Sequence, residues 1–455
     1  MADLTRETTL ADPRPALSGD DLATLGERLG QIDTAREARS EALARYSESA
    51  LPDRVQHLWR FSNPVHLLPE NLSTIVLTGA GVTPSDLPEV PGAAATVDLW
   101  PGDNPVASLG SGLAAGQLVV GPLDGAMAAG TLDDRDAPSA LFRHLNAAAW
   151  NAGVQIDVSA GAVLTGPVVV RIHAQGAAVL PRILFRVGSQ AEATLVEQHV
   201  DGGSGRYVVG RSDIVAGTGA RVRHVLLQTW ESGTNGHLTV MSRVGRDADL
   251  LSVFATFGGE RVKMELNTDL QGQGARSRMV GVALGSENQR FDHHTRHRHL
   301  AGHTWSDIDF KSVGSDRSRN SYTGLIRIEE DARNSEAYQV NRNLLLSGNS
   351  RADAIPELEI LNEEVSCSHG ATVAPVDPDQ LFYLQSRGWI PMTPCVWSFA
   401  DSWKKPCRVF PRPCGPMWRR WWRAGWPTCG RRPDGIPGSV TSRARRHPGL
   451  RRPAG

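Results

Sequence analysis

One cysteine and one histidine, two positions apart, could together bind a soft metal. The stretch "EEVSCSHGATV", residues 363–373, holds Cys367 and His369, and no other cysteine occurs in residues 1–390. Iron and iron–sulfur clusters accept thiolate and imidazole as ligands. In a strand, residues i and i+2 point to one face, about 7 Å apart along the backbone. The alternative is an inert buried thiol beside a hydrogen-bonded imidazole.

This pair is incomplete as a metal site. A tetrahedral site needs four ligands, and one sulfur with one nitrogen supplies only two of them. If Cys367 and His369 bind a metal, we therefore expect the remaining ligands to come from elsewhere, above all from another subunit.

A second group of chemically active residues lies in "FDHHTRHRHLAGHT", residues 291–304. Its five histidines could ligate iron or take part in a proton-linked step. The alternative is a set of solvated or hydrogen-bonded imidazoles on an outward face. The histidines are His293, His294, His297, His299 and His303.

Other catalytic motifs are absent from the sequence. There is no GxxxxGK[ST] phosphate loop, no HExxH, no GxSxG and no CxxC. "GSGLAAG", residues 110–116, has the wrong spacing for a dinucleotide-binding loop.

Composition limits the class of protein. The 455 residues carry 48 Lys+Arg against 49 Asp+Glu, and this balance favours neither nucleic acid nor a membrane surface. No run of eighteen apolar residues occurs, and the N-terminus lacks a secretory pattern. A single cysteine over 390 residues excludes a disulfide framework there and indicates a reducing cytoplasm.

Residues 389–455 differ from the rest of the chain. They hold 14 Lys+Arg and only two acids, together with four of the five cysteines, seven of 12 tryptophans and 11 of 28 prolines. One interpretation is a basic aromatic arm for nucleic acid or membrane. The other is translation in a shifted frame, because Arg, Pro, Gly, Trp and Cys have G- and C-rich codons. We expect the second.

Two helical regions are predicted in the first 153 residues. Residues 18–50 have leucines at helical spacing, with Asp20 as the expected N-cap, and Leu58 and Trp59 then dock a shorter turn. Residues 138–152 start at a proline and precede Gly153, which predicts a second helix. Between them, residues 72–130 are typical of small strands and loops.

From residue 154 onward, short strands alternate with small-residue turns at a near-constant period. The turn alanines Ala162, Ala191, Ala220, Ala248 and Ala275 are separated by 29, 29, 28 and 27 residues; further turns lie at Ala332 and Ala352. A fixed period of this length with strands and no helices predicts stacked coils, that is, a β-helix or solenoid. A β-sandwich gives no reason for such a period. In "NRNLLL" we expect Leu344–Leu346 to fill the column and the asparagines to ladder along the turns.

The predicted organisation has four parts. They are a helical segment over residues 1–70, a small mixed α/β region over 71–153, a β-helix core over 154–388 and an aberrant tail over 389–455.

Several stretches resemble the SufB/SufD family of iron–sulfur cluster assembly proteins. They are "SEAYQVNRNLLLSGNSRADAIPELEILNEEVSCSHGATVAPVDPDQLFYLQSRG", "FDHHTRHRHLAGHTWSDIDFKSV" and "HLNAAAWNAGVQIDVSAGAVLTGPVVV". Asp292, His294 and His299 fall in places that match the family's aspartate–histidine segment. Gly370 after His369 favours the SufD branch, because the SufB branch characteristically has a glutamate there.

The resemblance implies a mainly β fold, with a helical N-terminal domain, a right-handed parallel β-helix and a C-terminal helical domain. It also implies a non-catalytic scaffold that pairs with SufB through the β-helix and with the ATPase SufC through the C-terminal helices. The family's interface ligands fall on Cys367 and His369, and the resemblance favours His369 as the ligand of a transient Fe–S cluster shared with SufB. His294 and His299 are further candidate metal ligands.

One departure from the family bears on the partners. After Arg387 and Gly388 the family continues into amphipathic helices, whereas this chain continues into the basic tail, so we expect impaired binding of SufC. The alternatives are a SufB-like scaffold, a β-helix enzyme acting on polysaccharide, or a nucleic-acid-binding protein that uses its tail.

Overall fold

The computed structural model describes residues 14–31, 33–53, 55–69, 90–123, 139–201, 206–377, 379, 382–383 and 386–387. These residues belong to one unit, Met1–Trp389. The expectations for the basic tail, for the C-terminal helical domain and for residues 70–89 and 124–138 lie outside the described residues. No helix in the described part is both long and apolar enough to cross a bilayer.

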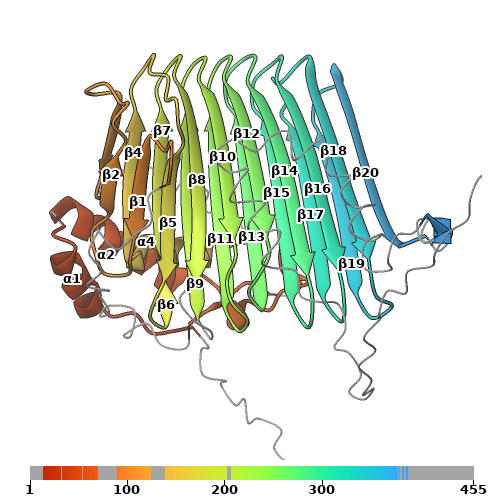
Figure 1. Ribbon diagram of the computed structural model, residues 1–455, viewed down its shortest axis with the longest axis horizontal. Coiled ribbons are helices and arrows are strands. Elements are labelled where there is room, and N and C mark those ends of the chain that lie inside the picture. Colours follow the sequence, from red (N-terminus) through yellow and green to blue (C-terminus); the bar gives the residue numbers. More distant parts are fainter. Residues whose placement is uncertain are drawn as a thin grey trace, which may run out of the picture. The chain divides into compact units, whose positions relative to one another are not determined.

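Two sheets of mostly parallel strands form the two faces of a solenoid (Figure 1). Among the strands of the described residues, only the pairs β1–β2 and β3–β4, at the N-terminal end, are antiparallel. Sheet A runs in the order β2 (Val106–Leu109), β1 (Ala95–Leu99), β5 (Val168–Ala174), β8 (Glu192–Asp201), β10 (Arg221–Gln228), β12 (Asp249–Thr256), β14 (Arg276–Gly285), β16 (Trp305–Gly314), β18 (Ser335–Leu345) and β20 (Val365–Pro375). Sheet B runs in the order β3 (Leu118–Gly121), β4 (Ala152–Val158), β7 (Pro181–Val187), β9 (Tyr207–Ala216), β11 (Asn235–Val244), β13 (Arg261–Leu270), β15 (Arg290–His299), β17 (Arg319–Ile328) and β19 (Arg351–Ile360), with β6 (Ala178–Val179) beside β9. The predicted stacked-coil fold is confirmed.

The predicted turn alanines mark a corner of the coils. Ala191, Ala220, Ala248 and Ala275 are fully buried, each directly before a strand of sheet A. The residue before each of them has a positive φ, for example 60° at Gln190 and 67° at Gly219. The side chain after this tight turn points into the crowded corner, and alanine fits there without strain.

Three turns depart from the predicted series. After Ala275 the next corner position is taken by Thr304, which is buried and follows the positive-φ residue His303 (58°), and this explains why the sequence pattern skips a coil there. The following corner is Ser335, which is fully buried and follows the positive-φ residue Asn334 (54°), so Ala332 lies in the turn three residues before the corner. Ala352 is not part of the series, because it lies within β19 of sheet B and is not fully buried.

The inward column mixes apolar and polar side chains. The expectation for "NRNLLL" was wrong, because Asn341 and Asn343 are buried while Leu344 and Leu345 are only half-buried. Asn343 Nδ2 donates to Asn341 Oδ1 at 2.5 Å, and Asn341 Nδ2 donates to the carbonyl of Phe310 at 3.2 Å. The amides therefore satisfy one another inside the solenoid.

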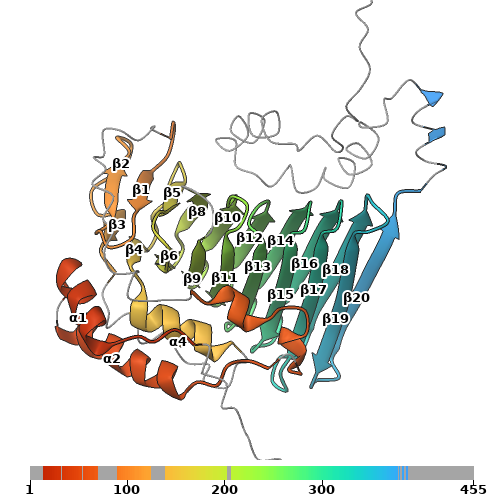
Figure 2. The ribbon, with the colours of Figure 1, turned by 90° about the horizontal axis from the view of Figure 1, so that it is seen from below.

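Three helices pack near the N-terminal end of the solenoid (Figure 2). They are α1 (Gly19–Arg28), α2 (Asp33–Glu48) and α4 (Ala140–Ala149). The predicted helical region 18–50 is thus two helices, and Gly30 between them has a φ of 62°. The N-cap of α1 is Ser18, which accepts from the backbone N–H of Asp21, and not Asp20 as predicted.

A short segment, residues 57–68, runs along the outer face of sheet B and is here called the strap. It contains two 3-10 turns, η1 (His57–Trp59) and η2 (Pro64–Leu67). His57 Nε2 lies 3.4 Å from Glu357 Oε1 of β19, and Ser62 Oγ donates to Asp292 of β15 at 2.6 Å. The predicted docking through Trp59 is confirmed, since its side chain is fully buried.

Candidate functional site

Cys367 and His369 lie on β20, the last strand of sheet A (Figure 1). Their partners in the parallel register are Ala337 and Gln339 of β18, both of which are buried in the interior. Residues in register on neighbouring parallel strands point to the same side. The two candidate ligands therefore share the inward face of the last coil, as the i, i+2 spacing predicts.

The last coil leaves this face less covered than any before it. Cys367 is half-buried and packs against the core, whereas His369 is exposed. No further strand pairs with β20 in the described part of the chain, so one edge of its backbone is unpaired. An open edge of this kind is a template for pairing with another chain.

The local chemistry of the two candidate ligands differs. Burial raises the pKa of the Cys367 thiol, although a hydrogen bond with the backbone of Ala337 opposes this. The thiol therefore holds its proton at neutral pH, and a metal ion would have to displace it. The imidazole of His369 is exposed to solvent.

The histidine-rich strand β15 divides its side chains between two faces. His293, His297 and His299 point into the solenoid and are buried, while His303 lies in an exposed turn. The expected outward position is thus wrong for these three histidines. The hydrogen bonding expected of them is confirmed. His293 Nε2 lies 2.9 Å from Thr256 Oγ1, and His297 Nε2 lies 3.3 Å from Ser277 Oγ. His299 Nδ1 and Nε2 lie 2.7 and 2.9 Å from Thr304 Oγ1 and Ser306 Oγ.

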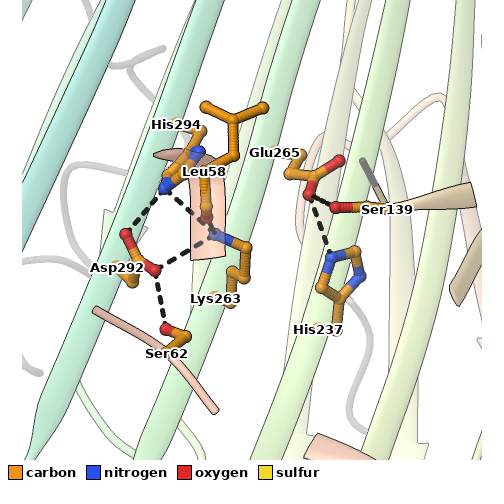
Figure 3. Close-up of polar contacts among 8 residues, drawn as sticks. All are labelled: Leu58, Ser62, Ser139, His237, Lys263, Glu265, Asp292 and His294. Atoms are coloured by element: carbon orange, nitrogen blue, oxygen red, sulfur yellow. Dashed lines mark hydrogen bonds and ion pairs between the residues drawn. The ribbon is translucent and has the colours of Figure 1, made fainter. Parts of the chain in front are cut away.

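Asp292 and His294 point outward and meet a buried lysine beneath the strap (Figure 3). Lys263 Nζ contacts three acceptors, namely Leu58 O at 2.7 Å, Asp292 Oδ2 at 3.1 Å and His294 Nε2 at 3.0 Å. His294 Nε2 also lies 2.8 Å from Asp292 Oδ1. Burial by itself raises the pKa of Asp292, but Lys263, His294 and the hydroxyl of Ser62 together bring it well below its ordinary range.

A second polar group beside it fixes the start of helix α4 (Figure 3). Glu265 of β13 accepts from the hydroxyl of Ser139 and lies 3.3 Å from His237 Nε2. The ring of His237 stacks on Phe142 at 4.3 Å between centroids, and Phe142 stacks on Trp59 of the strap at 5.2 Å. The whole group is buried, so its role in the folded chain is to join the strap and α4 to sheet B.

The structure does not bring the two sets of predicted residues together. Cys367 and His369 are on sheet A, whereas Asp292 and His294 are on sheet B, two strands in from its last strand. In the part of the chain that the structure describes, no three His, Cys, Asp or Glu side chains are close enough to hold a metal ion. The metal-ligand role of His294 and His299 stays a prediction, and each already uses ring nitrogen atoms in hydrogen bonds.

Sequence reasoning missed Lys263, although a signal was present. Lys263 precedes Asp292 by 29 residues, which is one coil, and the two are paired in register on β13 and β15. The predicted period could therefore have placed them side by side. Nothing comparable marked Ser62 or Ser139, because their contacts come from segments outside the repeat.

Comparison with known proteins identifies the core of the solenoid. Residues 170–391 match the family model "SUF system FeS cluster assembly, SufBD core domain". The chain is 30% identical over 269 residues to the iron–sulfur cluster assembly protein SufD of Escherichia coli (strain K12), covering 56% of this chain and 63% of that protein. It is 28% identical over 281 residues to an iron–sulfur cluster assembly SufBD family protein of Mycobacterium leprae, covering 59% of this chain and 69% of that one. It is 27% identical over 255 residues to the iron–sulfur cluster assembly protein SufB of Bacillus subtilis, covering 54% of each. The chain thus spans a little more than half of the SufD and SufB relatives, and the identities do not separate the two types.

The Lys263–Asp292 pair gives a prediction about stability. Asp292→Asn leaves the ammonium of Lys263 buried without its counter-charge, so we expect a loss of about 3–5 kcal/mol in the free energy of unfolding. Denaturant unfolding followed by circular dichroism measures it. Glu192→Gln, which removes an exposed ion pair with Arg221, is the control and should cost less than about 1 kcal/mol. Equal effects of the two variants would contradict the structural role of the buried pair.

The interior histidines predict a fall in stability in mild acid. Burial lowers the pKa of His293 and His297 to about 3 and that of His299 to about 4, whereas the unfolded chain titrates near 6.5. Above about pH 6.5 these histidines are neutral in both states and do not lower the free energy of unfolding. As the pH falls from 6.5 toward the pKa values of the folded state, the unfolded chain binds protons that the folded chain does not. The free energy of unfolding therefore falls, by about 2 kcal/mol for each histidine at pH 5. Unfolding measured from pH 7.5 to 5 tests this, and His297→Gln should flatten the slope. An unchanged slope in that variant would contradict the assignment.

Proposed function

We propose that the chain, whose residues 170–391 match the SufBD core domain model, belongs to the SufB/SufD family and is a SufD-like subunit of an iron–sulfur cluster assembly complex. The observation that carries the proposal is the position of Cys367 and His369 on the inward face of the uncovered end strand β20. The cluster is cargo in this account: it is built at the subunit boundary and then transferred to an acceptor protein.

The partner at this boundary is a SufB chain. The unpaired edges of β19 and β20 offer backbone groups for strand pairing, and Ile360, Leu361 and Val373 add exposed apolar surface at 42, 48 and 43%. The partner would supply the ligands that complete the iron shell. ATP hydrolysis belongs to the SufC partner, and this chain is a non-catalytic scaffold in the cytoplasm.

A SufB-like scaffold is the second candidate, and the match to B. subtilis SufB at 27% identity supports it. The two candidates differ in whether the chain alone assembles a cluster. Anaerobic reconstitution of the isolated chain with iron and sulfide, followed by absorbance spectroscopy, separates them: a stable cluster in the isolated chain indicates the SufB-like role.

The ligand pair gives the first prediction of this function. In a complex co-purified with SufB, we expect His369→Ala to lower the iron content more than Cys367→Ala. The imidazole of His369 is exposed and therefore accessible to iron, whereas the thiol of Cys367 is half-buried and its raised pKa opposes the loss of the proton that metal binding requires. Iron is measured per complex after anaerobic purification.

Ser368→Ala is the matched control, because Ser368 lies between the two ligands on the opposite face of β20. It should leave the iron content and the yield of SufB unchanged. Equal iron content in the wild type and in both ligand variants, with SufB still bound, would instead favour the inert thiol and the hydrogen-bonded imidazole.

The basic tail gives a second prediction. We propose that residues 389–455 arise from a shifted frame and replace the SufC-docking helices, so deletion of the tail should change neither SufC nor SufB recovery in a pull-down. Recovery of SufC with the full chain and its loss on deletion would contradict this. Sequencing the gene downstream of the codon for Gly388 tests the frame directly.

A further inference from the structure

The side chain directly beneath the candidate ligand His369 is that of Gln339 on β18. The two residues are partners in the parallel register, so their backbones are about 4.8 Å apart and both side chains point into the solenoid. In the two preceding strands of sheet A the same position holds Ile308 and Met279, which are apolar and fully buried. This column of side chains therefore changes from apolar to polar in the coil that lies under His369.

One half of the Gln339 amide is held by the opposite sheet. Its Nε2 donates to the carbonyl of Gly324 on β17 at 3.2 Å, across the interior of the coil. A Cβ at position 324 would overlap both this Nε2 and the hydroxyl of Tyr322, so the glycine makes room for the amide to cross. Because a carbonyl oxygen only accepts, the atom that faces Gly324 must be the NH₂ group, and the oxygen is the half left over.

The other half of the amide has no hydrogen bond within the described residues. Oε1 of Gln339 is buried, and buried side-chain oxygen atoms in folded proteins nearly always accept a hydrogen bond. Ile308 lies below this side chain and Gly324 lies across from it, so the remaining neighbour is the last coil. That coil places Pro356 over Gly324 and His369 over Gln339, and of these two side chains only the imidazole can donate.

The hydrogen bond is not formed in the chain alone, where the ring of His369 is exposed on the uncovered last coil. A neutral imidazole has one N–H group and one lone pair on its two ring nitrogen atoms. When the N–H group donates to Oε1 of Gln339, the lone pair is directed away from the amide, toward the uncovered side. Cys367 does not compete for Oε1, because it lies over Ala337 and its thiol is hydrogen-bonded with the backbone there.

We propose that Gln339 is a positioning residue for His369: its Oε1 accepts a hydrogen bond from one ring nitrogen and so directs the other ring nitrogen to iron at the subunit boundary. Gln339 itself does not contact the metal. Metal-bound histidines commonly have such a partner on their second nitrogen, and its loss typically weakens metal binding by about 10- to 100-fold. This role rests on the proposed function, because it exists only if His369 binds iron.

Replacing Gln339 in the complex co-purified with SufB tests the role. The iron of each complex is titrated anaerobically with a chelator, and the chelator concentration that removes half of it is measured. Gln339→Met keeps the length of the side chain but lacks Oε1, so we expect this concentration to fall by about tenfold or more. Gln339→Glu keeps an acceptor oxygen and loses the amide donor to Gly324, so it should retain iron nearly as well as the wild type.

The glutamate variant separates positioning from a purely structural role, because a residue that only joins the two sheets through Nε2 would fail equally as methionine and as glutamate. The double variant His369→Ala/Gln339→Met gives a second readout. It should release iron no more easily than His369→Ala alone, since Gln339 acts through the imidazole. Thermal unfolding and the yield of SufB check that each variant is folded, and Gln339→Leu replaces the methionine variant if that one gives no complex.

Gln228→Met is the matched control. Gln228 of β10 is also a buried inward glutamine whose Nε2 donates to a backbone carbonyl, that of Gly258 at 3.0 Å, but it is far from the last coil. Its replacement should leave iron retention unchanged. Wild-type retention in Gln339→Met, equal losses in the methionine and glutamate variants, or multiplying effects in the double variant would overturn the role of Gln339 and leave His369 as a ligand. Iron retention that does not depend on His369 would overturn the proposed function as well.

Discussion

The structure depends on one constraint, which is that each coil of the solenoid buries its inward side chains only against its neighbours. Within the stack, the corner alanines and the inward strand residues are fully buried, as Ala337 and Gln339 of β18 are. At the last coil the same register positions are occupied by Cys367 and His369, and there the covering coil is missing from the described chain. Positions that serve as core in every earlier coil thus become surface at the end. The candidate ligands Cys367 and His369 are therefore less covered than their counterparts in β18, without any special loop.

The outer face of sheet B shows a different use of burial. Lys263, Asp292 and Glu265 are charged, yet the strap and α4 cover them. Well-packed apolar residues could stabilise such a contact equally well, because desolvation offsets most of the attraction between buried charges. The polar group instead fixes a position. Because the ammonium of Lys263 contacts Asp292, His294 and the carbonyl of Leu58 at once, the backbone of Leu58 must lie at one place on the sheet. The pairing therefore specifies where the strap docks more than it strengthens the fold.

The sequence predicted the parts of the fold that repeat and failed where the repeat is broken. The spacing of Ala191, Ala220 and Ala248 predicts the coils because a tight corner excludes larger side chains. Thr304 escaped notice, since a threonine fits the same corner when His299 and Ser335 hydrogen-bond its hydroxyl. The inward direction of the β15 histidines was also missed, because imidazoles that bond to interior hydroxyls are as polar in sequence as solvated ones. The i, i+2 spacing of Cys367 and His369 correctly predicted that the two side chains share one face of a strand. The sequence did not predict that this strand, β20, is the last of its sheet in the described chain; the strand order of the structure showed that.

The end strand of sheet B connects the two faces of the molecule. Glu357 and Glu359 belong to β19, the strand whose far edge is unpaired in the described chain. Glu357 also holds His57 at the tip of the strap. The strand that offers the unpaired edge of sheet B therefore also carries the contact that fixes one end of the strap. A change in the position of β19 would move both features together, so the last coil links the edge of the sheet with the docking of the strap.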